Sequence, residues 1–346
     1  MLHSLVVGLG RAGAGLHLRV LAQARERDRD PFHPGAIIAC DPAPRTRLVR
    51  PGVTAAESVR AAAELVPPGR TVVHLCTPPV DRPALLRELA GLGFRRFVVE
   101  KPLAVDLAGL AEIERIRARH GLRLAVVAHW LDAELTRRLA RLIGGGSLGP
   151  LRSMSFHQHK PRFAHTKSTS GHPTAFDVEL PHSLGVALHL GGPAELVGAE
   201  SADMRCGDLV LPGMGGARML LRHRDGTRTE LVSDLTAPVR ERRVELDFAR
   251  GRVVGHYPLS DQDHHAQLHV PGAPRPWEVF PDDALTEFVL RTYRRFRARV
   301  PEPDPEADER FAQQCEVVRL LAAAKGRRVG TTGPVRHQRR TSDHAG

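Results

Sequence analysis

The sequence predicts an α/β protein with two domains, a parallel sheet layered with helices followed by an α+β domain whose sheet is mostly antiparallel and open on one face. Three observations carry this prediction. The chain has 346 residues, more than a single hydrophobic core usually serves. Short apolar strands alternate with helices over residues 1–128. After residue 128 the pattern changes to strands in which polar and apolar residues alternate.

Strands and helices of the first domain, residues 1–128, follow one another in regular order. An apolar strand near residues 4–8 turns through glycines into a helix whose apolar residues recur at helical spacing. The expected further strands are GAIIAC (35–40), RTVVHLC (70–76), FRRFVVE (94–100) and LRLAVVA (122–128), with helices over 81–93 and 107–121. Strands joined by helices of ten or more residues indicate a parallel sheet with right-handed crossovers.

The second domain is expected over residues 129–326, for substrate binding and oligomerisation. It opens with a helix over 134–146 that ends in a run of glycines. Segments 151–163, 218–235, 242–259 and 266–272 read as strands and hairpins, and 282–299 and 305–325 as helices. Residues 327–346 form a basic tail with little apolar content, which predicts a disordered end.

Composition excludes several classes of protein. The formal net charge of +11, with 19 histidines beside it, favours anionic partners, yet no stripe of basic and aromatic residues points to nucleic acid. The four cysteines are far apart, which argues against a disulfide framework or a zinc site. No apolar run is long enough to span a bilayer and no signal peptide precedes the first strand, so we expect a cytoplasmic protein without membrane partners.

A glycine loop follows the first strand. Gly8, Gly10 and Gly13 fit G-x-G-x-x-G, with Arg11 and Ala12 between the last two glycines. The first glycine permits a tight turn, the second lets a pyrophosphate approach the backbone, and the third lets helix and strand pack closely. The sequence therefore predicts a Rossmann dinucleotide-binding domain with the phosphates at the helix N-terminus.

An acidic residue at the end of the second strand bears on which dinucleotide binds. Asp41 can accept hydrogen bonds from the adenosine ribose hydroxyls, which favours NAD as cofactor. Arg45 and Arg47, just beyond it, could receive a 2′-phosphate, so NADP stays an alternative.

Three features coincide in the first domain: the glycine loop, CTPP at the end of one strand (76–79) and EKP at the end of another (100–102). In their order and spacing they resemble the Gfo/Idh/MocA family of oxidoreductases, over about residues 4–325. The resemblance implies NAD(P)-dependent hydride transfer to or from a carbinol carbon of a sugar, cyclitol or related molecule. It implies that Thr77, Pro78 and Glu100 lie along the cofactor, and that Lys101 moves the proton of the reacting oxygen, as a positioned ammonium can.

Two positions depart from the family pattern. Members carry an aspartate four residues before a catalytic histidine that is the acid/base partner of the lysine. Here His182 takes the histidine position, so the resemblance implies that it handles the proton together with Lys101, but Val178 precedes it by four. We expect Glu179 to orient His182 in place of the aspartate, with Asp177 as a second candidate that could also bind substrate. Where many relatives have an asparagine, this sequence has His129, which could bind substrate or cofactor.

The substrate is expected to be small and could be anionic. Strand alternation puts Lys160 and Arg162 on one face and His157 and His159 on the other. The two cations suit phosphate or carboxylate. No histidine spacing matches a known metal site, so no metal is predicted. Two rival functions remain, an imine reductase of the same fold and a non-catalytic nucleotide sensor. The resemblance also implies a homodimer or homotetramer.

Overall fold

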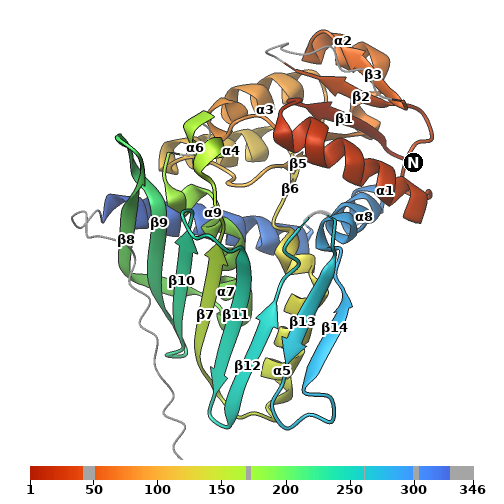
Figure 1. Ribbon diagram of the computed structural model, residues 1–346. Helices are drawn as coiled ribbons and strands as arrows, with labels where there is room; N and C mark the ends of the chain where they lie inside the picture. Colours follow the sequence, from red (N-terminus) through yellow and green to blue (C-terminus); the bar gives the residue numbers. More distant parts are fainter. Residues whose placement is uncertain (42–50, 169–172, 261, 299–303, 328–346) are drawn as a thin grey trace, which may run out of the picture.

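The structure, a computed structural model, describes residues 1–41, 51–168, 173–260, 262–298 and 304–327, without the side chains of 165, 167 and 168. It confirms the predicted α/β fold, with a parallel sheet in one domain and a mostly antiparallel sheet in the other (Figure 1). No helix in the described part of the chain combines the length and apolar character needed to cross a membrane.

The first domain contains a six-stranded parallel sheet in the order β3-β2-β1-β4-β5-β6. This is the doubly wound order in which a dinucleotide binds at the carboxyl ends of the strands, where the strand order reverses between β1 and β4. The strands are β1 (His3–Val7), β2 (Ile37–Cys40), β3 (Val53–Ala56), β4 (Thr71–Leu75), β5 (Arg96–Val99) and β6 (Arg123–Val126). The helices are α1 (Leu18–Arg27), α2 (Val59–Leu65), α3 (Arg82–Gly91) and α4 (Leu107–His120).

The two faces of this sheet have separate cores. Leu5 and Val7 of β1 pack in the core that includes α3 and α4. Val6, which points the other way, packs in a core with α1 and with α8 (Ala284–Arg297). Helix α8 therefore returns from the C-terminal part of the chain to cover the first sheet, and Figure 1 shows it beside α1. The last helix, α9 (Pro305–Gly326), runs across the junction of the two sheets.

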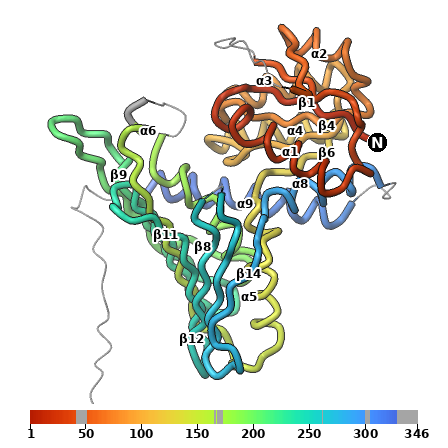
Figure 2. The backbone as a smooth tube through the Cα atoms, turned by 45° about the vertical axis from the view of Figure 1, so that its right-hand side comes forward, coloured from red at the N-terminus to blue at the C-terminus, as the bar shows by residue number. Residues whose placement is uncertain are grey.

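The second domain is built on an eight-stranded sheet in the order β14-β13-β12-β11-β7-β10-β9-β8. Neighbouring strands pair antiparallel except β7 and β10, which are parallel. Helices α5 (Glu134–Gly145) and α7 (Leu180–Gly191) cover one face, and Figure 2 shows the other face open. The strands are β7 (Leu151–His159), β8 (Ala194–Cys206), β9 (Leu209–His223), β10 (Arg228–Asp234), β11 (Glu241–Phe248), β12 (Gly251–His256), β13 (His265–His269) and β14 (Trp277–Pro281).

Several elements were not predicted from the sequence. Strand β3 and helix α2 are short, and few of their residues are buried, so their hydrophobic periodicity is weak. The edge strands β8 and β14 bury few of their side chains, which removes the alternation that marks a half-buried strand. A short helix, α6 (Phe163–Ser168), also lies between β7 and α7.

Candidate functional site

The glycine loop has the geometry that its spacing predicts. Gly8 has a φ of +91°, a conformation that side chains other than glycine rarely adopt. A Cβ on Gly13 would lie 1.8 Å from the carbonyl oxygen of Gly8, so only glycine lets the helix approach the strand this closely. A Cβ on Gly10 would meet no atom within 4 Å, so the backbone there borders open space. These three positions fit a loop that accepts a pyrophosphate.

The loop enters its helix through a turn wider than the usual one. Arg11 and Ala12 begin a π-helical segment, η1 (Arg11–His17), which continues directly into α1. The hydrogen bonds of such a segment span five residues instead of the four of an α-helix, and such segments often occur at functional sites. It carries His17 into the interior, where the side chain is 2% exposed.

Asp41 lies at the end of β2, beside the loop. Its Oδ2 accepts a hydrogen bond of 2.7 Å from the backbone N–H of Leu9, which ties the carboxylate to the loop. This is the place where an acidic residue would meet an adenosine ribose. Arg45 and Arg47 lie outside the described residues.

The ends of β4 and β5 are joined by an arginine that sequence reasoning did not single out. Arg82, 1% exposed, donates to the carbonyl oxygens of Thr77 at 3.2 Å, Leu103 at 3.3 Å and Pro102. It therefore holds the CTPP segment, in which Pro78 precedes a 3₁₀ turn, against the EKP segment. An arginine in the first turn of a helix is unfavourable for the helix dipole, and this was the available signal that it serves another purpose.

Lys101 reaches from the end of β5 to the second domain. Its Nζ donates a hydrogen bond of 2.6 Å to the carbonyl oxygen of Val178. Burial lowers the pKa of Lys101 below its usual value, and the carboxylates of Glu179 and Glu100 act in the opposite direction. Val178, which stands where the sequence analysis looked for an aspartate, thus holds Lys101 through its backbone carbonyl.

His182 and His129 lie against each other beside this lysine. Their ring centroids are 4.9 Å apart in an edge-on arrangement, and Trp130 stacks on His182 at 5.5 Å. The Nδ1 atoms of both histidines are buried without a hydrogen-bond partner. Burial, with the charge of Lys101 adding to it, lowers the pKa of His182 well below its usual value; burial and Arg242 lower that of His129 to about 4. Both imidazoles are therefore neutral near pH 7.

The structure corrects the expectation that Glu179 orients His182. Glu179 instead accepts hydrogen bonds from the Nζ of Lys160 and, at 3.4 Å, from the Nε2 of Gln158. Burial raises the pKa of Glu179, but the charges of Lys160 and Lys101 outweigh burial and bring this pKa to about 2. The physical reason is the nearer cation, since Lys160 offers Glu179 an ion pair that a neutral His182 cannot match.

Asp177 also has a different role from the one expected. It accepts hydrogen bonds from the N–H and Oγ1 of Thr174, closing a capping box, and pairs with the Nζ of Lys325 at 2.9 Å. These contacts point it toward α9 rather than toward His182, so it anchors the C-terminal helix and does not orient His182.

The predicted alternation of β7 is confirmed. Lys160 and Gln158 contact Glu179 on the helix-covered side, while His157 bonds Ser155 at 2.8 Å on the open face. Arg162 is 8% exposed and donates to the Oγ1 of Thr166 at 3.3 Å. Both predicted cations, Lys160 and Arg162, thus lie on the side of Glu179 and Lys101.

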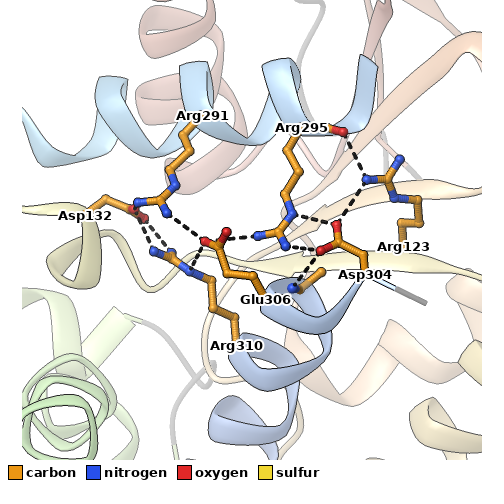
Figure 3. A network of polar contacts seen from close by, with 8 residues as sticks. Arg123, Asp132, Arg291, Arg295, Asp304, Glu306 and Arg310 are labelled. Carbon is orange, nitrogen blue, oxygen red and sulfur yellow. Dashed lines mark hydrogen bonds and ion pairs between the residues drawn. The ribbon is translucent and has the colours of Figure 1, made fainter. Parts of the chain in front are cut away.

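An arginine network supports the turn that carries His129. This turn, η4 (His129–Asp132), ends at Asp132, which is 1% exposed and accepts hydrogen bonds from Arg291 of α8 and Arg310 of α9 at 3.1–3.2 Å (Figure 3). Glu306 joins the same two arginines at 2.6 and 3.4 Å. Two C-terminal helices therefore fix the position of η4. Among the described residues, no three His, Cys, Asp or Glu side chains lie close enough together to hold a metal ion.

Comparisons with known proteins match this protein by its fold and not by its sequence. No protein-family model and no curated protein matches the sequence. Solved structures do match over nearly the whole chain, and they include proteins described as oxidoreductases, so the chain has the fold that the resemblance to the Gfo/Idh/MocA family predicted.

The individual matches extend over nearly the whole chain. KijD10, a 3-ketoreductase from Actinomadura kijaniata in complex with NADP and TDP-benzene, has 17% identity and a TM-score of 0.74, covering 96% of this chain and 99% of its own. A protein from Erwinia carotovora atroseptica described as an oxidoreductase has 16% identity and a TM-score of 0.70, covering 95% and 99%. Another, from Magnetospirillum magnetotacticum, has 20% identity and a TM-score of 0.66, covering 93% and 99%.

Proposed function

We propose that the protein is an NAD(P)-dependent oxidoreductase that transfers a hydride between the nicotinamide and a secondary alcohol or ketone of a small polar molecule. One observation carries the proposal: Lys101 and two buried imidazoles with unpartnered nitrogens, His129 and His182, gather at the carboxyl edge of the sheet that bears the glycine loop. A buried polar atom without a partner costs free energy, which a bound polar ligand recovers. NADP in the KijD10 structures supports a nicotinamide cofactor here.

Lys101 is the proton donor in this proposal. A bound nicotinamide would supply or accept the hydride. As charge develops on the substrate oxygen during ketone reduction, the ammonium of Lys101 stabilises it and transfers a proton to it. The lowered pKa of Lys101, caused by burial, makes this transfer easier near neutral pH. The neutral rings of His182 and His129 hold the substrate hydroxyls by accepting or donating single hydrogen bonds.

The substrate we propose is a sugar, a cyclitol or a related molecule, and an anionic group on it would meet Lys160 and Arg162. KijD10 is described as a 3-ketoreductase, and its complexes contain TDP-benzene, an anionic compound. Variants of KijD10 at a lysine and at a tyrosine have also been crystallised. In the present chain both tyrosines, Tyr257 and Tyr293, lie outside α7, whereas the charge of Lys101 acts on His182 of α7.

The test is absorbance of the reduced nicotinamide, with NAD and NADP in parallel, over cyclitols, sugars, nucleotide sugars and their keto forms. We expect Lys101→Met to lower kcat by at least about 100-fold, the usual contribution of a general acid. Lys101→Arg is the matched control, because it keeps the charge but does not release a proton near neutral pH, and it should be equally inactive. Cofactor affinity, followed by tryptophan fluorescence, should stay within about threefold in both. Undiminished turnover in Lys101→Met would refute the mechanism.

A further inference from the structure

A chain of buried hydrogen bonds crosses the first domain from the end of β5, which carries Glu100 and Lys101, to α8. The Oε1 of Glu100 lies 2.8 Å from the Nε2 of His17, and the Nδ1 of His17 lies 2.8 Å from the Nδ1 of His74. The Nε2 of His74 is 3.0 Å from the hydroxyl of Tyr293, which donates to the Oγ of Ser4 at 2.8 Å. His17 is 2% exposed, and His74, Tyr293 and Ser4 are fully buried.

The protons of this chain can be assigned from its far end. Because Tyr293 donates its proton to Ser4, its oxygen accepts from the Nε2–H of His74. His74 is a neutral imidazole, with a pKa lowered well below its usual value by burial and by His17, so its Nδ1 has no proton. His17 must then donate through Nδ1. Its Nε2 faces a carboxylate, which only accepts, so both nitrogens of His17 carry protons.

We propose that His17 is a positioning residue for the lysine: as a buried imidazolium it clamps Glu100, and with it the end of β5 that presents Lys101, onto the glycine-loop segment η1. The second oxygen of Glu100 accepts a hydrogen bond of 3.1 Å from the backbone N–H of Lys101, so the clamp acts on the lysine's own backbone. The proposal rests on the proposed role of Lys101, but the protonation of His17 is testable without it.

The clamp joins the two parts of the site that must keep a fixed distance. His17 closes the π-helical segment that starts directly after Gly10, so it moves with the loop proposed to hold the pyrophosphate. Glu100 precedes Lys101 at the end of β5. A fixed separation of cofactor and proton donor is what efficient hydride transfer requires. Tyr293 extends the chain to α8, which connects the clamp to the helix that also holds Asp132 through Arg291.

The charged groups around the clamp determine how it responds to pH. The side chains that act on His17 and Glu100 are His74, Cys76 and Arg82, together with Lys101, and Arg25 acts on His74. Burial lowers the pKa of His17, but Cys76 and Glu100 outweigh burial and raise this pKa to about 10. Burial raises the pKa of Glu100, but His17 outweighs burial and brings this pKa to about 2. The contribution of His17 to stability is complete below its unfolded pKa, near 6.5, and is lost as the pH rises through about 10.

The first experiment is nitrogen-15 NMR of the full-length protein labelled in its histidine rings, at about pH 8.5, two units above the ordinary histidine pKa. One imidazole should remain doubly protonated, in the native protein and in the control Tyr293→Phe, which breaks the far end of the chain. The signal should be absent in His17→Gln. If every imidazole of the native protein is neutral at this pH, the proposal is overturned, whether or not any variant folds.

The second experiment separates positioning from general structural support. Removing the imidazolium leaves the charge of Glu100 to act on Lys101 alone, which raises the pKa of the lysine. In ketone reduction, the pH above which kcat/KM falls should therefore move up by about one unit in His17→Gln and stay in place in Tyr293→Phe. Coincident pH profiles for the three proteins would overturn the proposal. Loss of the Lys101 mechanism would appear separately, as turnover that survives Lys101→Met.

Discussion

At the scale of single residues, Lys101 is held by a backbone carbonyl at a position where the sequence analysis looked for a carboxylate. Val178 stands at the position of the expected aspartate, and its carbonyl oxygen accepts the hydrogen bond of Lys101. A carbonyl accepts without adding a formal negative charge, so it does less than a carboxylate to counter the effect of burial on the lysine. Of the two carboxylates that act on Lys101, Glu179 is bound to Lys160 and Glu100 to His17. This substitution favours an ammonium that releases its proton readily.

The pair of Glu179 and Lys160 gives a residue-scale prediction. Both side chains are mostly buried, with 9% and 18% exposure, so removing one partner leaves a poorly solvated charge. We expect Glu179→Gln and Lys160→Met each to lower the free energy of unfolding by about 2 kcal/mol, and the double variant to lose about 1–2 kcal/mol less than their sum. Urea unfolding of the four proteins measures this coupling.

A second double-mutant cycle serves as the comparison and tests the pairing of Glu179 with His182 that the sequence favoured. Glu179→Gln combined with His182→Asn should be additive within about 0.5 kcal/mol, because the side chain of Glu179 hydrogen-bonds Lys160 and Gln158, and its contact with His182 is between backbone atoms, which neither substitution removes. A larger coupling of Glu179 with His182 than with Lys160 would restore the orienting role that the sequence suggested.

At the scale of elements, the glycine loop separates two requirements that its motif combines. Gly13 is required for packing, since its Cβ would overlap the carbonyl oxygen of Gly8. Gly10 has a φ of −69°, which any residue can adopt, and open space at its Cβ position. Only a ligand in that space would explain a glycine at this place.

The two alanine variants should therefore behave differently. Gly10→Ala should leave the free energy of unfolding within about 0.5 kcal/mol of native, yet weaken NAD(P) binding at least about tenfold, because the methyl group occupies the space of the pyrophosphate. Gly13→Ala should lower the free energy of unfolding by about 2–3 kcal/mol through overpacking. Thermal unfolding and fluorescence titration of both variants test this. Native cofactor affinity in Gly10→Ala would contradict the proposed site.

At the scale of the whole molecule, the C-terminal helices hold the two domains together. Helix α8 supplies Phe288 and Tyr293 to the core that the first sheet shares with α1, and Arg291 to the network around Asp132. Helix α9 supplies Phe311 to the core with α3 and α4, and Leu320 to the core of the second domain. The chain therefore crosses the junction repeatedly, and the site is bordered by segments from both ends of the sequence.

The open face of the second sheet predicts the character of the assembly we propose, a homodimer or homotetramer. Ion pairs cover this face, including Arg243 with Glu245 at 2.7 Å and Arg252 with Asp247 at 2.6 Å. An interface formed there is polar, so light scattering should give a multiple of the 37.9 kDa chain mass at low salt and a smaller assembly at about 1 M salt.

A matched pair of charge reversals locates this interface. Arg243→Glu on the open face should shift the assembly toward the monomer, whereas Arg137→Glu on α5, which covers the opposite face, should not. A monomer under all conditions, or equal effects of the two reversals, would refute assembly through the open face.

The α/β fold with its two sheets, the glycine loop, and the places of Asp41 and Lys101 at strand ends could be predicted from the sequence, because they depend on local patterns: hydrophobic periodicity, and short motifs in which a strand, a turn and a helix adjoin. The partners of the polar side chains could not, because they depend on the tertiary structure. Glu179 is bound to Lys160 rather than to His182, and Asp177 to Lys325, because the nearest cation in space comes from a segment distant in sequence. Arg82 and His17 became visible for the same reason, since burial of a charge is defined by the surrounding fold.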